Sequence, residues 1–318
     1  MNSIYLRNVE PAMDFVQLAA WFTQLEDWPN TEESLHTFYK EEQARIIPKI
    51  AVNDRDEILG FSWLEKNTMD PERAYFYLFV APEHRRKGTG SLLYQDMLQS
   101  IASLRLKKLR VSVWDNCPEG RSFADKRGFA ERLHQIAMQL DLRTFDDTPY
   151  QTVIDRLQGE GFRFTSMGEL GNTEDAQRKE YILNESTSED VPGTGGEKAW
   201  SSFEDFQKRV CQADWYIADG QKVVIDSASG QFVAMSAITR YKDADYAYNL
   251  HTGVDRNYRG RGLAQAVKIT ALRYARDVLK VDTVRTHHNT FNLPMIAIDR
   301  KLGYMQQPGT FAMQKMLD

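Results

Sequence analysis

The feature that most constrains the fold is an internal repeat. The segment Arg85-Arg86-Lys87-Gly88-Thr89-Gly90 is matched 174 residues later by Arg259-Gly260-Arg261-Gly262-Leu263-Ala264. The pair Gly128-Phe129 is matched 175 residues later by Gly303-Tyr304. Two matches in the same order and at nearly the same spacing indicate two copies of one domain.

The repeat places the division of the 318-residue chain near its middle, in agreement with a typical domain length of ~150 residues. Residues 141–149 contain Asp146-Asp147-Thr148-Pro149, a combination typical of turns and helix starts. We therefore predict a first domain at residues 1–145 and a second at residues 146–318.

Strand-like and helix-like patterns follow the same order in both halves. In the first half we expect strands at residues 47–52, 58–65, 74–80 and 109–114, a helix at 14–24, and a helix after the Arg/Gly-rich segment with Leu93, Met97 and Ile101 on one face. In the second half we expect strands at 162–165, 215–218, 232–239, 247–254 and 283–287, helices at 203–211 and from 263, and a long loop at 186–196. This order predicts the α/β (α+β) class, with each domain a mixed β-sheet flanked by helices.

The composition argues against several classes of protein. Forty Lys and Arg residues against forty-five Asp and Glu residues give a net charge of −5, so no overall basic field favours nucleic acid or a membrane surface. Two cysteines cannot form a disulfide framework, and no apolar run approaches the ~20 residues that cross a bilayer. We expect a cytoplasmic protein with no nucleic-acid or membrane partner.

Each Arg/Gly-rich segment follows a predicted strand and begins a predicted helix. Small residues let the backbone approach a ligand, and the N-terminus of a helix attracts anions. Arg85, Arg86, Lys87, Arg259 and Arg261 add full positive charges, which suits a pyrophosphate. Neither copy has the spacing of a dinucleotide fingerprint or a Walker loop. The alternative is a tight turn whose cations are solvated.

Arg85-x-x-Gly88-x-Gly90 and Arg259-x-x-Gly262-x-Ala264 resemble the acyl-coenzyme A motif of the GNAT N-acetyltransferases. The pairs Gly128-Phe129 and Gly303-Tyr304 resemble the end of that family's conserved region. The resemblance covers both halves and therefore implies two tandem GNAT domains, each with a splayed sheet. It is especially close in the second half.

The resemblance implies acetyl-coenzyme A as a co-substrate and no metal. The backbone N–H groups of Val80 and Val254 would face the thioester carbonyl as oxyanion contacts. The coenzyme-binding residues would be Val80, Arg85, Arg86, Lys87, Gly88, Thr89, Gly90 and Ser91 in the first half, and Val254, Arg259, Gly260, Arg261, Gly262, Leu263, Ala264, Asn289 and Asn292 in the second.

Acetyl transfer to an amine needs a neutral amine, a stabilised oxyanion and a proton for the leaving thiolate. The family often supplies that proton from a tyrosine four residues before the Gly-aromatic pair, but Ala124 and Asp299 occupy those positions here. His251, three residues before Val254, is a candidate base, and Tyr77 stands at the matching place in the first half. The alternative for His251 is a hydrogen-bonded structural residue.

We therefore predict an acetyl-coenzyme A-dependent N-acetyltransferase that acts on a small-molecule or peptide amine. The second half is expected to carry the main activity, because it has the fuller match and the histidine. The alternative is an acyl-coenzyme A sensor or scaffold in which one or both domains are catalytically degenerate. A monomer and a homodimer are both compatible with the sequence.

Overall fold

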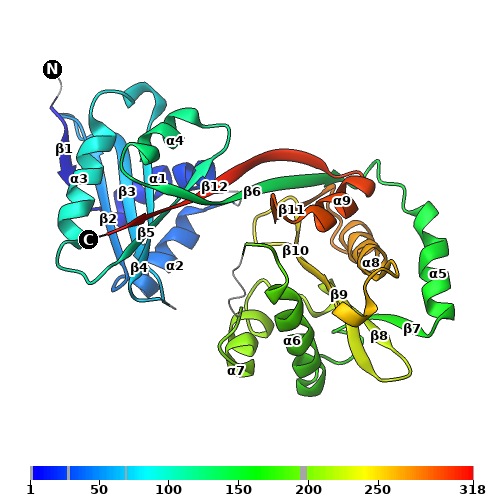
Figure 1. Ribbon diagram of the computed structural model, residues 1–318. Helices are drawn as coiled ribbons and strands as arrows, with labels where there is room; N and C mark the ends of the chain where they lie inside the picture. Colours follow the sequence, from blue (N-terminus) through cyan, green and yellow to red (C-terminus); the bar gives the residue numbers. More distant parts are fainter. Residues whose placement is uncertain (1–2, 27–28, 69, 194–198, 318) are drawn as a thin grey trace. The chain divides into compact units, whose positions relative to one another are not determined.

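The computed structural model describes residues 3–26, 29–68, 70–193 and 199–317 (Figure 1). The chain divides into two compact units, one formed by Met1–His134 together with Gly309–Asp318 and the other by Gln135–Pro308. The first unit thus ends before the predicted boundary at 145/146, and it includes the last residues of the chain.

The first unit contains a mixed sheet covered by helices. Its helices are α1 (Pro11–Leu25), α2 (Glu32–Glu42), α3 (Thr89–Ile101) and α4 (Pro118–Asp125). Its strands are β1 (Tyr5–Arg7), β2 (Ile46–Val52), β3 (Ile58–Lys66), β4 (Arg73–Val80), β5 (Lys108–Trp114) and the final part of β12 (Met305–Met316). The sheet order is β1-β2-β3-β4-β5-β12, with β4 and β5 parallel and the other pairs antiparallel.

An aromatic core lies between this sheet and the helices α1 and α2. Phe15, Phe61 and Trp63 are fully buried there, and Trp21 stacks on Phe79 with ring centroids 4.9 Å apart. A second core involves α3, whose Leu93, Met97 and Ile101 are all buried, as their helical spacing predicts.

The second unit repeats this plan. Its helices are α5 (Gln151–Gly159), α6 (Glu174–Glu189), α7 (Phe203–Phe206), α8 (Leu263–Asp277) and α9 (Leu293–Lys301). Its strands are the final part of β6 (Ala130–Asp141), β7 (Phe162–Ser166), β8 (Gln221–Asp226), β9 (Gln231–Thr239), β10 (Ala247–Val254) and β11 (Thr283–Asn289). The sheet order is β6-β11-β10-β9-β8-β7, and only β10 and β11 are parallel.

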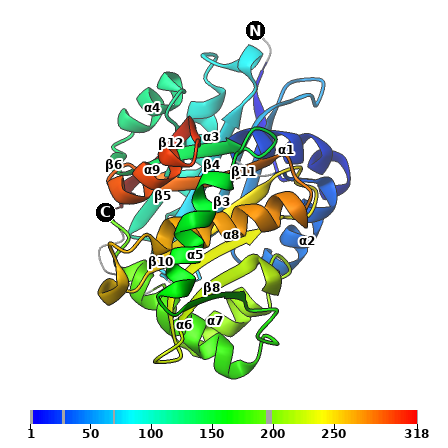
Figure 2. The same ribbon diagram turned by 90° about the vertical axis from the view of Figure 1, so that its right-hand side faces the viewer.

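Helices α8 and α6 cover opposite faces of the second sheet (Figure 2). On β9, Ala234 and Ile238 belong to the core beneath α8, whereas Met235 belongs to the core beneath α6. This alternation follows from the two-residue period of a strand.

The parallel strands separate in both units. β4 pairs with β5 only from Arg73 to Tyr75, and β10 pairs with β11 only at Ala247 and Tyr248. The rest of each pair diverges toward the C-terminal ends, where Val80 and Val254 lie. The structure therefore has the splayed sheets that the sequence predicts.

Two strands cross the boundary between the units. β6 begins in the first unit and pairs with β11 of the second through residues 135–141. β12 begins in the second unit and pairs with β5 of the first through residues 310–316. Each unit thus completes its sheet with a strand that begins in the other unit, an exchange that the repeat does not predict.

Two predictions about local structure in the second unit are wrong. Residues 215–218 do not form a strand, because Trp215 and Tyr216 pack against the aromatic cluster of α6 and α7, and the strand is β8 at residues 221–226. The predicted loop at 186–196 begins later, because α6 continues to Glu189. Residues 194–196 of that loop lie outside the described residues.

Candidate functional site

Both Arg/Gly-rich segments join a strand to a helix with the same backbone geometry. Gly88 and Gly262 precede α3 and α8 and have φ angles of 94° and 92°. Two residues earlier, Arg86 and Gly260 also have positive φ angles, 60° and 77°. The left-handed conformation is easy for glycine and costs Arg86 roughly 1 kcal/mol. We call these two segments, residues 85–90 and 259–264, the first and second phosphate loops.

The first arginine of each phosphate loop anchors the loop to the preceding strand. Arg85 Nε donates to the Val80 carbonyl at 3.1 Å, and Arg259 Nε donates to the Val254 carbonyl at 3.1 Å. These arginines therefore fix the position of each loop relative to the splayed strand, in addition to supplying charge.

The helices α3 and α8 begin without a side-chain cap. Gly88 and Gly262 are the N-cap residues and offer no side chain to the first backbone N–H groups. A Cβ atom built at Gly88 or Gly260 would have no atom within 4 Å, so the space beside both loops is open. Uncapped N–H groups next to open space and arginines suit a pyrophosphate.

The second unit has a β-bulge that the first lacks. The register of β10 against β9 shifts between Asn249 and His251, whereas β4 pairs with β3 without a shift. Asn249 stabilises the bulge, because its amide donates to the Ala237 carbonyl at 2.7 Å. A bulge re-aims the side chains that follow it.

The bulge places His251 on the face covered by α6. Its Nε2 lies 2.8 Å from Thr187 Oγ1, and Thr187 also donates to the Leu183 carbonyl at 2.8 Å. Thr187 therefore accepts from His251, and Nδ1 is the unprotonated nitrogen of the ring. Burial lowers the pKa of His251 to about 4, so the ring is neutral near pH 7.

In the first unit, Tyr77 stands at the matching place. Burial raises its pKa, and the nearby carboxylates of Glu26 and Glu65 raise it further. The phenol therefore stays protonated near neutral pH and offers no base at this position.

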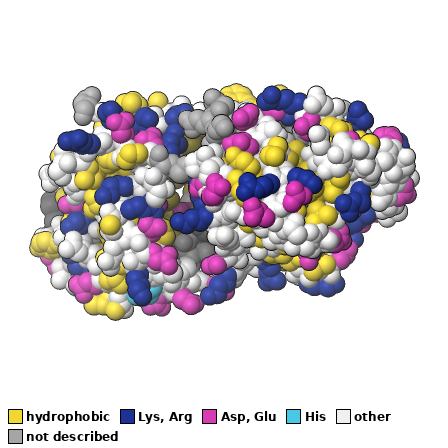
Figure 3. All heavy atoms as spheres, turned by 90° about the horizontal axis from the view of Figure 1, so that it is seen from below, with side chains coloured by type: hydrophobic (Ala, Val, Ile, Leu, Met, Phe, Trp, Pro, Cys, Tyr) yellow, Lys and Arg dark blue, Asp and Glu magenta, His cyan; other side chains and the backbone are white. Residues whose placement is uncertain are grey.

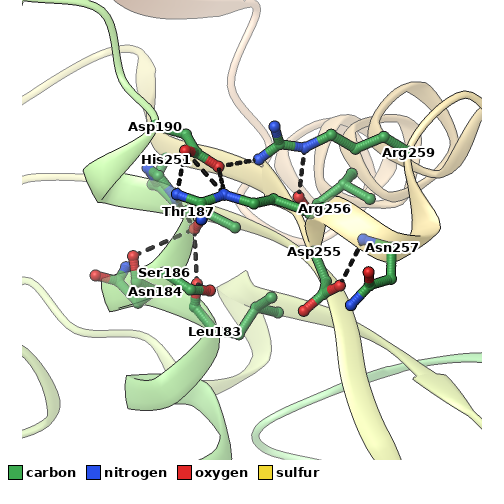
Figure 4. A network of polar contacts seen from close by, with 11 residues as sticks. Leu183, Asn184, Ser186, Thr187, Asp190, His251, Asp255, Arg256, Asn257 and Arg259 are labelled. Carbon is green, nitrogen blue, oxygen red and sulfur yellow. Dashed lines mark hydrogen bonds and ion pairs between the residues drawn. The ribbon is translucent and has the colours of Figure 1, made fainter.

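The carboxylate of Asp190 contacts the second phosphate loop through Arg259 (Figure 4). Asp190, just after α6, accepts from Arg256 Nε at 2.9 Å and from Arg256 Nη2 at 2.5 Å, and it also forms an ion pair with Arg259. The hydrogen bonds from Arg256, with those from Arg259, lower the pKa of Asp190 to about 2. In the first loop, the Arg85 ion pair is longer, 3.8 Å to the exposed Glu119.

The segment after Asp190 contacts a further predicted residue. Asn289, the last residue of β11, donates from Nδ2 to the Pro192 carbonyl at 2.6 Å. Asn292 is the N-cap residue of α9, and its backbone N–H donates to the Asn289 carbonyl at 2.8 Å. Both asparagines thus lie at the end of the splayed strand β11.

The two positions at which the family often has a proton-donating tyrosine have different surroundings in the two units. Ala124 is part of an apolar core in the first unit. Asp299 in the second unit is fully buried, forms an ion pair with Lys268 and accepts from His288 Nε2 at 2.6 Å. Lys268 and Asp190 were not among the predicted site residues. The sequence does single out Lys268, because it is the one lysine of α8 and its neighbours there are mostly small or apolar.

The described residues contain neither a metal-binding cluster nor a membrane-crossing helix. Within the part of the chain that the structure describes, no group of three or more His, Cys, Asp or Glu residues could hold a metal ion. No helix in the described ranges is long and apolar enough to cross a membrane. On the face in Figure 3, basic and acidic side chains are interspersed rather than gathered by sign.

The sequence matches the acetyltransferase (GNAT) family over residues 14–129 and again over residues 184–304. No curated protein sequence matches the chain significantly.

Solved structures share the fold over nearly the whole chain. A GCN5-related N-acetyltransferase from Sphaerobacter thermophilus is 15% identical, with a TM-score of 0.71 and coverage of 98% of this chain and 95% of that one. A tandem GNAT protein from the clavulanic acid biosynthesis pathway is 16% identical, with a TM-score of 0.70 and coverage of 99% and 98%.

The splayed sheets, the two phosphate loops and the family match define a protein with two GNAT domains. The chain belongs to the GNAT acetyltransferase family.

Proposed function

We propose that the protein is an acetyl-coenzyme A-dependent N-acetyltransferase that transfers the acetyl group directly to an amine of a small molecule or peptide. The observation that carries the proposal is the pair of phosphate loops, each at the end of a splayed strand and each beginning an uncapped helix. Such a loop holds the pyrophosphate of coenzyme A, and the opening between the strands receives the thioester arm.

The reaction forms one bond and breaks another. The neutral amine attacks the thioester carbonyl carbon, a C–N bond forms, and the oxyanion accepts from a backbone N–H group, for which Val254 or Val80 is the candidate. The C–S bond then breaks, the amine nitrogen loses a proton, and the thiolate sulfur gains one. No metal or redox group takes part in these steps.

We propose that the second unit carries the main activity. The β10 bulge, the neutral His251 beside it and the asparagines at the end of β11 all belong to that unit. With its pKa near 4, His251 is a weak base, so its proposed role is to accept a hydrogen bond from the amine or from a water that removes the proton.

Two charge substitutions test the coenzyme site. Gly88→Glu and Gly262→Glu each place an anion where the pyrophosphate must approach. We expect each to weaken coenzyme A binding in its own unit at least 100-fold, about 2.7 kcal/mol, measured by calorimetry. Gly88→Ala and Gly262→Ala are the matched controls for backbone strain, and both should bind far better than the glutamates. Unchanged affinity and stoichiometry in both glutamate variants would contradict the proposal.

The same variants assign the activity. Thiol release from acetyl-coenzyme A, measured with a panel of amines, should be lost in Gly262→Glu and largely kept in Gly88→Glu. The opposite result would mean that the first unit is the active one.

A second candidate function is acyl-coenzyme A sensing without turnover. It is favoured by Ala124 and Asp299 at the two proton-donor positions and by the contact of Asp190 with Arg256 and Arg259. Tight binding of acetyl-coenzyme A with no thiol release for any amine would support this alternative.

A further inference from the structure

Three elements of the second unit bring ionisable side chains together in its interior. Lys268 comes from α8, Asp299 from α9 and His288 from β11. Asp299 forms an ion pair with Lys268 through one oxygen and accepts from His288 Nε2 at 2.6 Å through the other. Lys268 and Asp299 are 0% exposed and His288 is 8% exposed.

Burying these three groups is unfavourable, and the first unit forms the same fold without them. Desolvating the two ions of a buried pair is unfavourable, and their attraction offsets this only with good geometry and further hydrogen bonds. In the first unit, Tyr94, Ala124 and Val113 stand at the same places of α3, α4 and β5. That set is uncharged, and Tyr94 and Ala124 lie in an apolar core. The fold therefore does not need the three charged or titratable groups.

The electrostatics keep Asp299 ionised. Burial alone would raise its pKa, but Lys268 and His288 hold the pKa below its ordinary value. The neighbouring Tyr304, whose ring lies 4.8 Å from the Lys268 ammonium, has a pKa raised by burial and stays neutral. An ionised Asp299 accepts the Nε2–H of His288 and fixes the orientation of the ring.

Two members of the cluster lie on the elements that border the proposed coenzyme site. His288 is on the part of β11 that has separated from β10. Lys268 lies five residues after the first residue of α8, ~8 Å along the helix from the second phosphate loop. Of the described residues, none forms a hydrogen bond with His288 Nδ1, so that nitrogen is available for proton exchange.

We propose that His288 donates a proton from Nδ1 to the leaving thiolate, and that Asp299 and Lys268 are positioning residues for its ring. The inference rests on the proposed function. As the C–S bond breaks, the sulfur takes the Nδ1 proton and the ring becomes neutral. The proton lost by the attacking amine passes to water, and water returns a proton to Nδ1. No other reactant is needed.

His288→Gln tests the role directly, because the glutamine amide can still donate to Asp299 but cannot transfer a proton. We expect kcat for acetyl transfer to fall 10²–10⁴-fold, with coenzyme A affinity unchanged within about twofold. Wild-type kcat in His288→Gln, with activity lost in Gly262→Glu, would overturn the inference and leave the proposed function standing.

A second variant separates a structural role of the cluster from a catalytic one. It replaces the three residues of the cluster with the residues at the matching places of the first unit. The triple variant Lys268→Tyr, His288→Val, Asp299→Ala should fold and bind coenzyme A, yet lose kcat as His288→Gln does. Full activity in the triple variant would refute the role of the cluster.

A further readout does not depend on turnover. The imidazole resonance of His288, assigned by its absence in His288→Gln, should shift when coenzyme A is added to the wild-type protein. No shift under conditions where calorimetry shows coenzyme A bound to the second unit would overturn the inference. No coenzyme A binding in either unit would instead contradict the proposed function.

Discussion

Asp190 pairs with Arg259 of the second phosphate loop and with the nearby Arg256, so its substitution should strengthen coenzyme A binding to the second unit. In Asp190→Asn the side chain keeps its size but loses the charge that pairs with Arg256 and Arg259. Both arginines would then be free of a carboxylate competitor. The same change removes a stabilising contact, so binding and stability should move in opposite directions.

The magnitude follows from the pKa of Asp190. The hydrogen bonds from Arg256 and Arg259 lower it from 3.8 to about 2, which corresponds to ~2.4 kcal/mol at 1.36 kcal/mol per unit. The side chains of Arg256 and Arg259 are 63% and 47% exposed, so solvent screening reduces this figure to ~1 kcal/mol. We therefore expect Asp190→Asn to lower the free energy of unfolding by ~1 kcal/mol and to tighten coenzyme A binding ~5-fold.

The pH dependence has a definite sign. Because the folded-state pKa lies below the unfolded value of 3.8, the stabilisation by Asp190 is complete above that value and is lost as the pH falls toward 2. The stability difference between wild type and Asp190→Asn should therefore be constant from pH 5 to pH 8.

Calorimetry with coenzyme A and thermal unfolding measure the two effects. Glu119→Gln is the matched control, because Glu119 pairs with Arg85 of the first loop only at 3.8 Å and should change neither quantity. Weaker coenzyme A binding in Asp190→Asn would refute the reasoning, since Asp190 would then orient the arginines for the ligand rather than compete with it.

Two further predictions concern α6. Burial raises the pKa of Glu180 to about 8, so the carboxyl destabilises the second unit as the pH rises from its unfolded value of 4.5 to about 8. At 1.36 kcal/mol per pKa unit, Glu180→Gln should therefore stabilise the protein by ~5 kcal/mol at pH 9 and leave it unchanged at pH 4 in thermal unfolding, and equal effects at both pH values would contradict this. A Cβ at Gly253 would lie 2.5 Å from Thr187 Cβ, so Gly253→Ala should cost ~1–3 kcal/mol. Adding Thr187→Gly, which removes the opposing Cβ, should recover part of that loss, and strictly additive effects would show that the two residues do not clash.

The sequence predicted those features that depend on short stretches of chain. The phosphate loops follow from Gly88, Gly262 and their neighbours, and the buried face of α3 follows from the spacing of Leu93, Met97 and Ile101. Both signals are local, so they survive without knowledge of the rest of the fold.

The features that the sequence did not predict depend on distant contacts. Asp190 lies in a stretch that was expected to be a loop, and nothing near it in sequence indicates that it meets Arg256 and Arg259. The sequence could not predict the exchange of β6 and β12 for a different reason. Two copies of one domain have the same strand patterns whether a strand pairs within its own copy or with the other, so the repeat could not distinguish the two pairings.

The course of β12 has a consequence for synthesis. The edge of β5 that receives residues 310–316 stays open until those residues have left the ribosome, although residues 3–134 emerge long before. At 5–20 residues per second, this interval lasts roughly 10–35 s. During that time β5 is an unpaired edge that a second nascent chain can add to. The part of the protein that is made first is thus completed last, and a fragment that ends at residue 145 would keep this exposed edge permanently.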